Sequence, residues 1–250
     1  MDHDFRARLL AGEQLVGSIV SLPTPEIAEI LAGLGFDWLF IDAEHSPLQF
    51  GQVQTLLQVA CSSCSCLVRV PSDDPVWLSK ALDVGASGVI VPRVSTAAQV
   101  EEIVSWCKYP PQGKRGLGVA RAHGYGCRLN EYLATANQAT AVVVQAESIE
   151  AVRNMAEIAR VPGLDAVFVG PYDLSASVGK PGQVDDPEVK DAVAEVTDIC
   201  LTAGVKLGAF GIDAAAIQPF LDNGYTLIAV GIDVVFLTNG ARLVLSALGR

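Results

Sequence analysis

The sequence repeats one short pattern four times, and this pattern predicts an alternation of helices and parallel strands. Each copy is a glycine, a short linker and an apolar run. The glycine can adopt the left-handed conformation that ends a helix, and the apolar run is typical of a strand buried on both faces. The four copies cover residues 35–42, 85–92, 163–170 and 224–231.

Four further strand candidates lie between these copies and bring the expected number to eight. Helical patterns follow most strands and begin at pairs such as Thr24-Pro25, Asp74-Pro75 and Asp186-Pro187, where an oxygen can cap the helix and proline suits its first turn. Eight repeats within residues 1–250 favour a single (β/α)8 TIM barrel. An open doubly wound sheet is the alternative, although no glycine-rich dinucleotide motif follows the first strand. The further candidates cover residues 16–21, 66–70, 141–145 and 205–210.

Composition limits the partners of such a barrel. The chain has 17 Lys and Arg against 28 Asp and Glu, a net charge of −11, and lacks the basic run that phosphate backbones require. Its apolar runs fall short of the ~20 residues of a membrane span, and no apolar signal core follows its charged start. We therefore expect a cytoplasmic protein with neither nucleic acid nor membrane as partner. The 6 cysteines lack the second spaced pair of a zinc ribbon and are expected to be reduced.

Two segments do not fit the simple alternation. Residues 109–138 form a long gap between the fourth and fifth strands, rich in glycine and arginine. This loop either covers a site and offers Arg115 or Arg121 to an anion, or is a surface excursion. His123 lies in it and is expected to be a surface residue rather than a catalyst. The last helix, over residues 234–248, is rich in apolar side chains, which indicates packing against another subunit or burial within the monomer.

Polar residues at the carboxyl ends of the strands are the candidates for function, because barrel enzymes place their chemistry there. Glu147 and Asp173 end neighbouring strands, whose axes are ~4.8 Å apart, and their carboxylates would repel without a cation or proton between them. Oxygen ligands without thiols suit Mg²⁺ or Mn²⁺. The alternative makes Glu147 an exposed residue at a helix start and Asp173 a turn residue.

Arg69 and His45 are the candidates for charge stabilisation and proton transfer. Arg69 ends an apolar strand, so it either pairs with Asp42 or Glu44 or, as we favour, stabilises negative charge on a substrate oxygen. His45 comes three residues after Asp42, whose carboxylate can orient the imidazole as a general base. No lysine is placed to project into the barrel, so an imine mechanism is not expected.

Six motifs resemble the HpcH/HpaI family, which comprises class II, metal-dependent pyruvate aldolases. They occur in the family's order through nearly the whole chain, and together they are specific. The resemblance implies a barrel of the phosphoenolpyruvate/pyruvate type. The motifs are FDWLFIDAEHSP at residues 36–47, LVRVP at 67–71, DVGASGVIVP at 83–92, GLGVAR at 116–121, QAE at 145–147 and VFVGPYDLS at 167–175.

The resemblance also implies an activity, the cleavage of a 4-hydroxy-2-oxo acid into pyruvate and an aldehyde, and the reverse addition. It implies that Glu147 and Asp173 bind a divalent metal, Mg²⁺, Mn²⁺ or Co²⁺, that chelates the 2-oxo acid. Arg69 would then stabilise the enolate oxygen, while His45, paired with Asp42, works with a metal-bound water as the base.

Three further residues are implied in substrate binding. Gln145 would line the floor of the site, and the amides around Gly170 would help to hold the carboxylate. Tyr172 stands where some relatives carry a small residue, so we expect it to influence the choice of aldehyde. The family also implies a homo-oligomer, a hexamer built as a trimer of dimers that exchange the C-terminal helix. A related oxaloacetate decarboxylase, an acyl-CoA ester lyase and a non-catalytic binder of 2-oxo acids remain alternatives.

Overall fold

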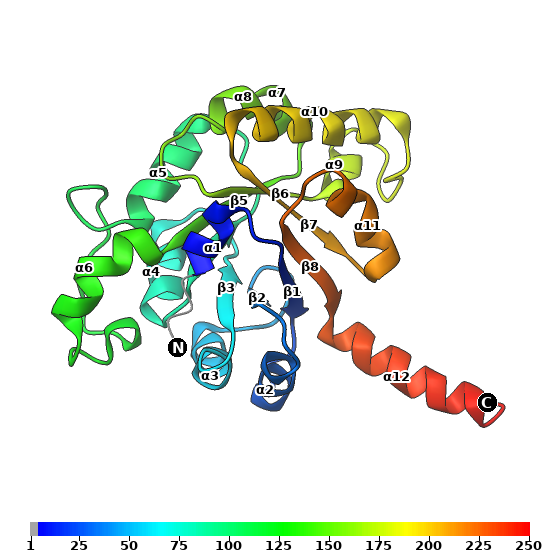
Figure 1. The fold of residues 1–250 in the computed structure, drawn as a ribbon, viewed down its shortest axis with the longest axis horizontal. Helices are drawn as coiled ribbons and strands as arrows, with labels where there is room; N and C mark the ends of the chain where they lie inside the picture. Colours follow the sequence, from blue (N-terminus) through cyan, green and yellow to red (C-terminus); the bar gives the residue numbers. More distant parts are fainter. Residues whose placement is uncertain (1–4) are drawn as a thin grey trace.

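The computed structural model describes residues 5–250 and contains the expected closed barrel of parallel strands (Figure 1). Each strand pairs in parallel with the next along the chain, and the last pairs with the first. The predicted (β/α)8 fold is therefore confirmed. The strands are β1 Leu15–Val20, β2 Trp38–Asp42, β3 Ser65–Arg69, β4 Gly88–Val91, β5 Ala141–Ala146, β6 Ala166–Val169, β7 Lys206–Gly211 and β8 Leu227–Ile232.

Helices surround the barrel, and two of the predicted caps form. The side chain of Asp74 accepts a hydrogen bond from the backbone N–H of Val76, and that of Asp186 accepts one from Glu188. Thr24 makes no such side-chain bond within the described chain. The helices are α1 Phe5–Ala11, α2 Pro25–Gly33, α3 Phe50–Ala60, α4 Pro75–Asp83, α5 Ala97–Cys107, α6 Leu129–Ala139, α7 Ile149–Arg153, α8 Met155–Ile158, α9 Pro171–Ser177, α10 Pro187–Ala203, α11 Ala214–Asp222 and α12 Asp233–Ala247.

Aromatic side chains fill the barrel interior, and charged groups are found at the carboxyl end of the strands. Phe5 of α1 packs against Trp38, with ring centroids 6.1 Å apart, and so covers the amino ends of the strands. Phe40 meets Phe168 edge to face further along the axis. The Arg69 guanidinium lies 5.1 Å from the centroid of the Phe40 ring. The packed interior thus ends, at the carboxyl side, on a floor that carries a positive charge.

The long loop, residues 109–138, lies at the end of the barrel opposite to the positively charged floor. Its residues, which include most of α6, lie between α5 and β5 and therefore at the amino ends of the strands, so the loop does not cover the mouth of its own barrel. Arg115 is buried in an ion pair with Asp83 at 2.8 Å, and Arg121 donates to the carbonyls of Leu57 and Val84. His123, expected at the surface, is instead buried, because both ring nitrogens bond to the backbone of the loop itself.

The last helix extends away from the barrel (Figure 1). Its apolar side chains are exposed, so they are not buried within the monomer, which was one of the two sequence interpretations. An apolar groove of about 680 Å³ lies between α12 and α2. None of the helices formed by residues 5–250 is long and apolar enough to span a bilayer. The exposed side chains on α12 and its end include Leu237, Leu243, Val244, Leu245 and Leu248.

Candidate active site

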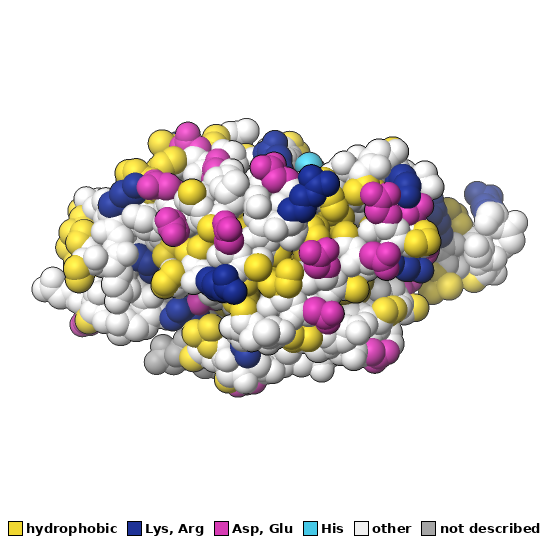
Figure 2. Space-filling model, turned by 90° about the horizontal axis from the view of Figure 1, so that it is seen from above, with side chains coloured by type: hydrophobic (Ala, Val, Ile, Leu, Met, Phe, Trp, Pro, Cys, Tyr) yellow, Lys and Arg dark blue, Asp and Glu magenta, His cyan; other side chains and the backbone are white. Residues whose placement is uncertain are grey.

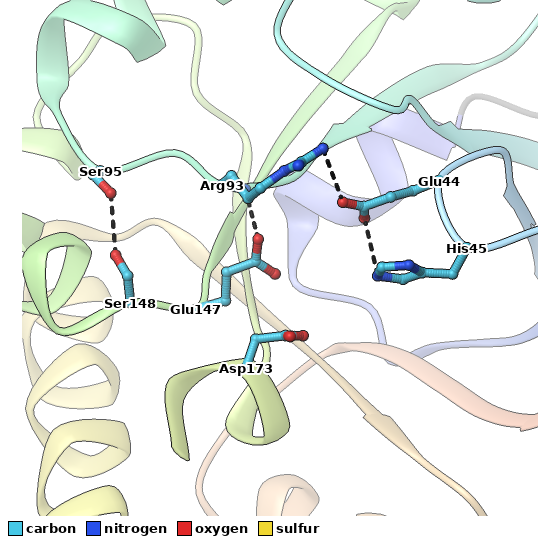
Figure 3. A pocket seen from close by; sticks show the side chains of 7 residues that line it. All are labelled: Glu44, His45, Arg93, Ser95, Glu147, Ser148 and Asp173. Carbon is cyan, nitrogen blue, oxygen red and sulfur yellow. Dashed lines mark hydrogen bonds and ion pairs between the residues drawn. The ribbon is translucent and has the colours of Figure 1, made fainter. Parts of the chain in front are cut away.

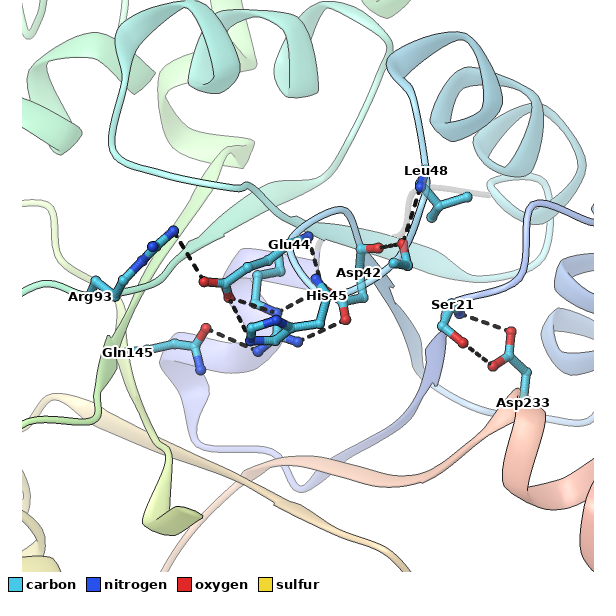
Figure 4. Close-up of polar contacts among 10 residues, drawn as sticks. Ser21, Asp42, Glu44, His45, Leu48, Arg93, Gln145 and Asp233 are labelled. Carbon is cyan, nitrogen blue, oxygen red and sulfur yellow. Dashed lines mark hydrogen bonds and ion pairs between the residues drawn. The ribbon is translucent and has the colours of Figure 1, made fainter. Parts of the chain in front are cut away.

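The barrel brings the expected polar residues together at its carboxyl end. A cavity of about 230 Å³ opens there (Figure 3), and three of the expected residues, His45, Glu147 and Asp173, line it. Arg69 links Asp42 and Gln145 to this cavity, because its guanidinium contacts Glu44, which lines the cavity (Figure 4). The other lining residues are Glu44, Arg93, Ser95 and Ser148.

Arg69 is held by a fixed set of acceptors. Its Nε and Nη2 donate to the two carboxylate oxygens of Asp42 at 2.9 and 2.8 Å, and its Nη1 donates to Gln145 Oε1 at 3.4 Å. Glu44 Oε2 lies 3.4 Å from Nε. Burial is the largest single effect and favours the neutral form of Asp42, but the hydrogen bonds and the charge of Arg69, together with the backbone N–H groups of Glu44 and His45, outweigh it and lower the pKa of Asp42. The guanidinium is therefore oriented before any substrate arrives.

The imidazole of His45 contacts a carboxylate other than the expected one. Asp42 accepts the backbone N–H groups of Glu44 and His45, at 3.0 and 3.3 Å, while both of its oxygens bond to Arg69. The His45 ring instead places Nε2 3.7 Å from Glu44 Oε2. Because the Asp42 carboxylate is occupied by Arg69, Glu44 takes the position beside the ring.

Glu44 is thus the central acid of the mouth, and the sequence had presented it only as a possible partner of Arg69. Its carboxylate is shared among Arg69, His45 and Arg93, at 3.4, 3.7 and 3.3 Å. Burial raises the pKa of Glu44, and the positive charges of Arg69 and Arg93 oppose this effect. Glu44 lies between Asp42 and His45, two predicted site residues, and this position was the signal that could have identified it.

Glu147 and Asp173 point into the same space, as expected of a pair of metal ligands (Figure 3). Glu147 Oε1 accepts the backbone N–H of Arg93 at 2.6 Å. Burial raises the pKa of Glu147, and repulsion from Asp173 and Glu44 raises it further. A bound cation would relieve this repulsion.

The donor set fits a hard divalent cation. Mg²⁺ is commonly bound by one or two carboxylates, with water and substrate as its other ligands. Within residues 5–250, no cluster of three or more His, Cys, Asp or Glu side chains forms an all-protein metal cage. Two carboxylates would leave the other positions of such a cation to water and substrate.

Gly170 and Tyr172 differ in their relation to the cavity. A Cβ on Gly170 would lie 3.2 Å from Glu147 Cβ and 3.5 Å from Glu147 Oε2, so glycine leaves room for that carboxylate. Tyr172 is exposed and lies outside the cavity lining, although it precedes Asp173 in α9. Its expected influence on the substrate stays a prediction.

Arg93 is a lining residue that the sequence analysis missed. It follows the carboxyl end of β4, and this position in a barrel was the signal that could have identified it. The buried lysine of the chain, Lys108, lies far from this end: it follows α5 and donates to the carbonyls of Asn137 and Thr140 at 2.8 and 2.7 Å. The expected lack of an imine-forming lysine at the mouth is consistent with this placement.

Comparisons with known proteins agree with the resemblance. The family model of the HpcH/HpaI aldolase/citrate lyases matches residues 17–240. The 4-hydroxy-2-oxovalerate aldolase of Rhodococcus jostii is 41% identical over 94% of this chain and 92% of its own length. The 4-hydroxy-2-oxo-heptane-1,7-dioate aldolase of Salmonella typhimurium is 39% identical over 100% of this chain and 95% of its own. A solved family member from Burkholderia cenocepacia superposes with a TM-score of 0.95, at 36% identity, covering 99% of this chain and 100% of that one.

Proposed function

Because the chain belongs to the HpcH/HpaI aldolase/citrate lyase family, we propose that it cleaves a 4-hydroxy-2-oxo acid into pyruvate and an aldehyde, and that it catalyses the reverse addition. Relatives that are 37–41% identical over nearly the full length are aldolases, so the protein is a lyase of the aldolase type. The observation that carries the substrate assignment is the convergence of Arg69 with the two carboxylates of Glu147 and Asp173 at one mouth.

Arg69 stabilises the charge that develops during cleavage. When the C3–C4 bond breaks, its electron pair passes into the 2-oxo group and forms the enolate of pyruvate. A guanidinium already oriented by Asp42 and Gln145 needs no reorganisation to stabilise that oxygen. A divalent cation held by Glu147 and Asp173, as Mg²⁺, Mn²⁺ or Co²⁺, would add a second positive charge that polarises the same group.

His45 moves the proton of the 4-hydroxyl group. Its side chain is 64% exposed at the mouth, where a substrate can reach Nε2. The ring accepts the hydroxyl proton as the C3–C4 bond breaks, and Glu44 stabilises the resulting imidazolium from 3.7 Å. The former C4 leaves as the aldehyde, and the imidazolium returns its proton to C3 of the enolate, which gives pyruvate and restores the neutral ring.

The test compares metal-stripped protein with protein loaded with Mg²⁺, Mn²⁺ or Co²⁺ on a panel of 4-hydroxy-2-oxo acids. Pyruvate is followed with a coupled dehydrogenase, and Mn²⁺ binding is followed by calorimetry. We expect turnover only with metal, and Glu147→Gln or Asp173→Asn to weaken Mn²⁺ binding and lower kcat/KM by at least about 100-fold. Asp191→Asn, on an exposed part of α10, is the matched control. Metal-independent turnover, or full activity in both site variants, would contradict the proposal.

The acyl-CoA ester lyase loses support, and the oxaloacetate decarboxylase is tested in the same assay. An acyl-CoA ester would need a basic rim for its phosphates, but the arginine-rich loop of this chain lies at the opposite end of its barrel. Oxaloacetate is included in the panel, because decarboxylation passes through the same enolate. A non-catalytic binder is not favoured, since each expected acid, Arg69 and His45 is present at the mouth.

We also propose that residues 1–250 act as one domain, in a hexamer built from dimers that exchange α12. The exposed apolar face of α12 supports the exchange. Its first residue is fixed to the barrel, because Asp233 accepts hydrogen bonds from the backbone N–H and the hydroxyl of Ser21, at 2.8 and 2.7 Å. All 6 cysteines are free thiols, which suits the proposed cytoplasmic location.

A further inference from the structure

Two arginines face the mouth at different depths. The Arg69 side chain is 12% exposed and bonds to Asp42 and Gln145, so it belongs to the floor. The Arg93 side chain is 66% exposed and lies at the rim, where its Nη2 is 3.3 Å from Glu44 Oε1. The inner cation is placed for the reacting oxygens, whereas the outer one is placed for a more distant part of the substrate.

The fold holds Arg93 in an uncommon backbone conformation. Its φ of 57° lies in the left-handed region, which a residue with a long side chain rarely adopts. The backbone N–H of Arg93 donates to Glu147 Oε1 at 2.6 Å in this conformation. Its side chain then runs over the cavity toward Glu44 (Figure 3). Strained residues of this kind cluster at functional sites.

The charged residues that line the cavity are mostly acidic, and this makes the position of Arg93 important for an anionic substrate. Of the residues in the described chain that line it, three are carboxylates and Arg93 is the one permanent cation. A negative group on the outer half of a substrate would be repelled by Glu44 and Asp173 unless it met Arg93. A guanidinium has five N–H donors, and Arg93 Nη2 serves Glu44 and the carbonyl of Pro71, so donors remain for a substrate.

We propose that Arg93 is a specificity-determining residue that selects substrates whose aldehyde half carries a carboxylate. This inference rests on the proposed aldolase function and adds the chemistry of the released aldehyde. Family membership leaves that chemistry open, because one full-length relative is named for a monoacid and another for a diacid. The carboxylate binds the exposed guanidinium as a charge-assisted pair, beyond the carbon that leaves as the aldehyde.

The test uses two 4-hydroxy-2-oxo acids that differ only at the far end, where one has a carboxylate and the other a primary amide of the same size. We expect wild-type protein to prefer the acid, mainly through a lower KM. Arg93→Met removes the charge and retains the chain length and the backbone N–H. We expect it to reduce the acid-to-amide ratio of kcat/KM by about 10-fold to 100-fold, since a hydrogen bond to a charged group contributes 1.5–3 kcal/mol.

Two controls separate recognition from other effects. Arg93→Lys should retain much of the preference, because it keeps a positive charge at the rim. Arg160→Met removes an exposed charge from the connection between α8 and β6, at the opposite end of the barrel, and should leave the ratio unchanged. The preference of the wild type should also weaken at high ionic strength.

The outcomes are distinguishable from a failure of the proposed function. Equal loss of kcat/KM for both substrates in Arg93→Met would mean that Arg93 only positions Glu44, and would overturn the inference while the aldolase function stands. A wild-type protein without preference for the acid would overturn it as well. If neither compound is cleaved under any metal condition, the aldolase function fails and the inference fails with it.

Discussion

The ion pair between Asp42 and Arg69 is buried, and its removal should affect stability in a pH-dependent way. The pKa of Asp42 in the folded protein lies below its ordinary value of 3.8, so the carboxylate stabilises the fold above about pH 4. This contribution is lost as the pH falls through the folded pKa. Asp42→Asn leaves Arg69 without its charged partner, and we expect the free energy of unfolding at pH 7 to fall by about 3 kcal/mol.

Urea denaturation between pH 7 and the acid limit of folding checks this prediction. The variant should show a flatter loss of stability below about pH 4 than the wild type, because it has no Asp42 carboxylate to protonate. Asp191→Asn, whose side chain is exposed on α10, should follow the wild-type curve. Parallel curves for wild type and Asp42→Asn would contradict the pH dependence, and coinciding curves would show that the pair does not stabilise the fold.

Strand ends in the sequence predicted which residues meet and offered Asp42 and Glu44 as partners of Arg69, but the predicted pairing of His45 with Asp42 was wrong. Asp42, Arg69 and Glu147 reach one mouth because parallel strands in a barrel share one carboxyl end. The pairing of Asp42 with Arg69 rather than with His45 depends on side-chain positions across two strands, which spacing along one strand does not encode. Arg93 was missed although it carries the same positional signal, because it follows the carboxyl end of β4 by two residues.

At the scale of elements, the first helix was absent from the sequence prediction. Its 7 residues bury only Phe5 and Leu9, too few for a periodic pattern. Its position depends instead on contacts with distant parts of the chain. Arg6 forms an ion pair with Asp165 at 2.8 Å, and Asp165 in turn accepts the backbone N–H of Val142 at 2.9 Å. The glycine-to-strand joints, by contrast, carry their signal locally and were predicted.

Arg6→Met should therefore loosen α1 without affecting the chemistry. Asp165 is buried, so the loss of its cation leaves an unpaired carboxylate, and we expect a loss of about 3 kcal/mol in the free energy of unfolding. The kcat/KM should stay within about 2-fold of wild type, since α1 covers the amino ends of the strands, away from the mouth. In a double-mutant cycle, Asp165→Asn should cost much less in the Arg6→Met background than alone. Additive losses would show that the pair is not coupled.

At the scale of the whole molecule, the net charge of −11 is spread over the surface. On the face in Figure 2, acidic side chains are interspersed with Lys and Arg and separated by apolar areas. The mouth has a different organisation, with Arg69 inside and Arg93 outside around shared carboxylates. The overall composition therefore predicts that polyanions are not partners, whereas acceptance of a small anion depends in our proposal on these two local charges.

The apolar groove between α12 and α2 yields a prediction about how the subunits assemble. Leu237 and Val244 on α12 line the apolar groove together with Ile30 of α2 and Leu34, which follows α2, and all four side chains are exposed. An apolar face of this extent is typical of a protein interface. In the proposed exchange, α12 of one subunit covers α2 of another, so each dimer buries two copies of the same face.

Leu237→Glu combined with Val244→Glu places two charges in that interface and should dissociate the dimers. Sedimentation equilibrium should then give a lower mass than wild type, and the melting temperature should fall and lose its dependence on protein concentration. Leu201→Glu, an exposed apolar residue on α10 outside the groove, is the matched control and should keep the wild-type mass. A wild-type mass for the double variant would mean that α12 does not form the interface, and that the groove is covered in another way.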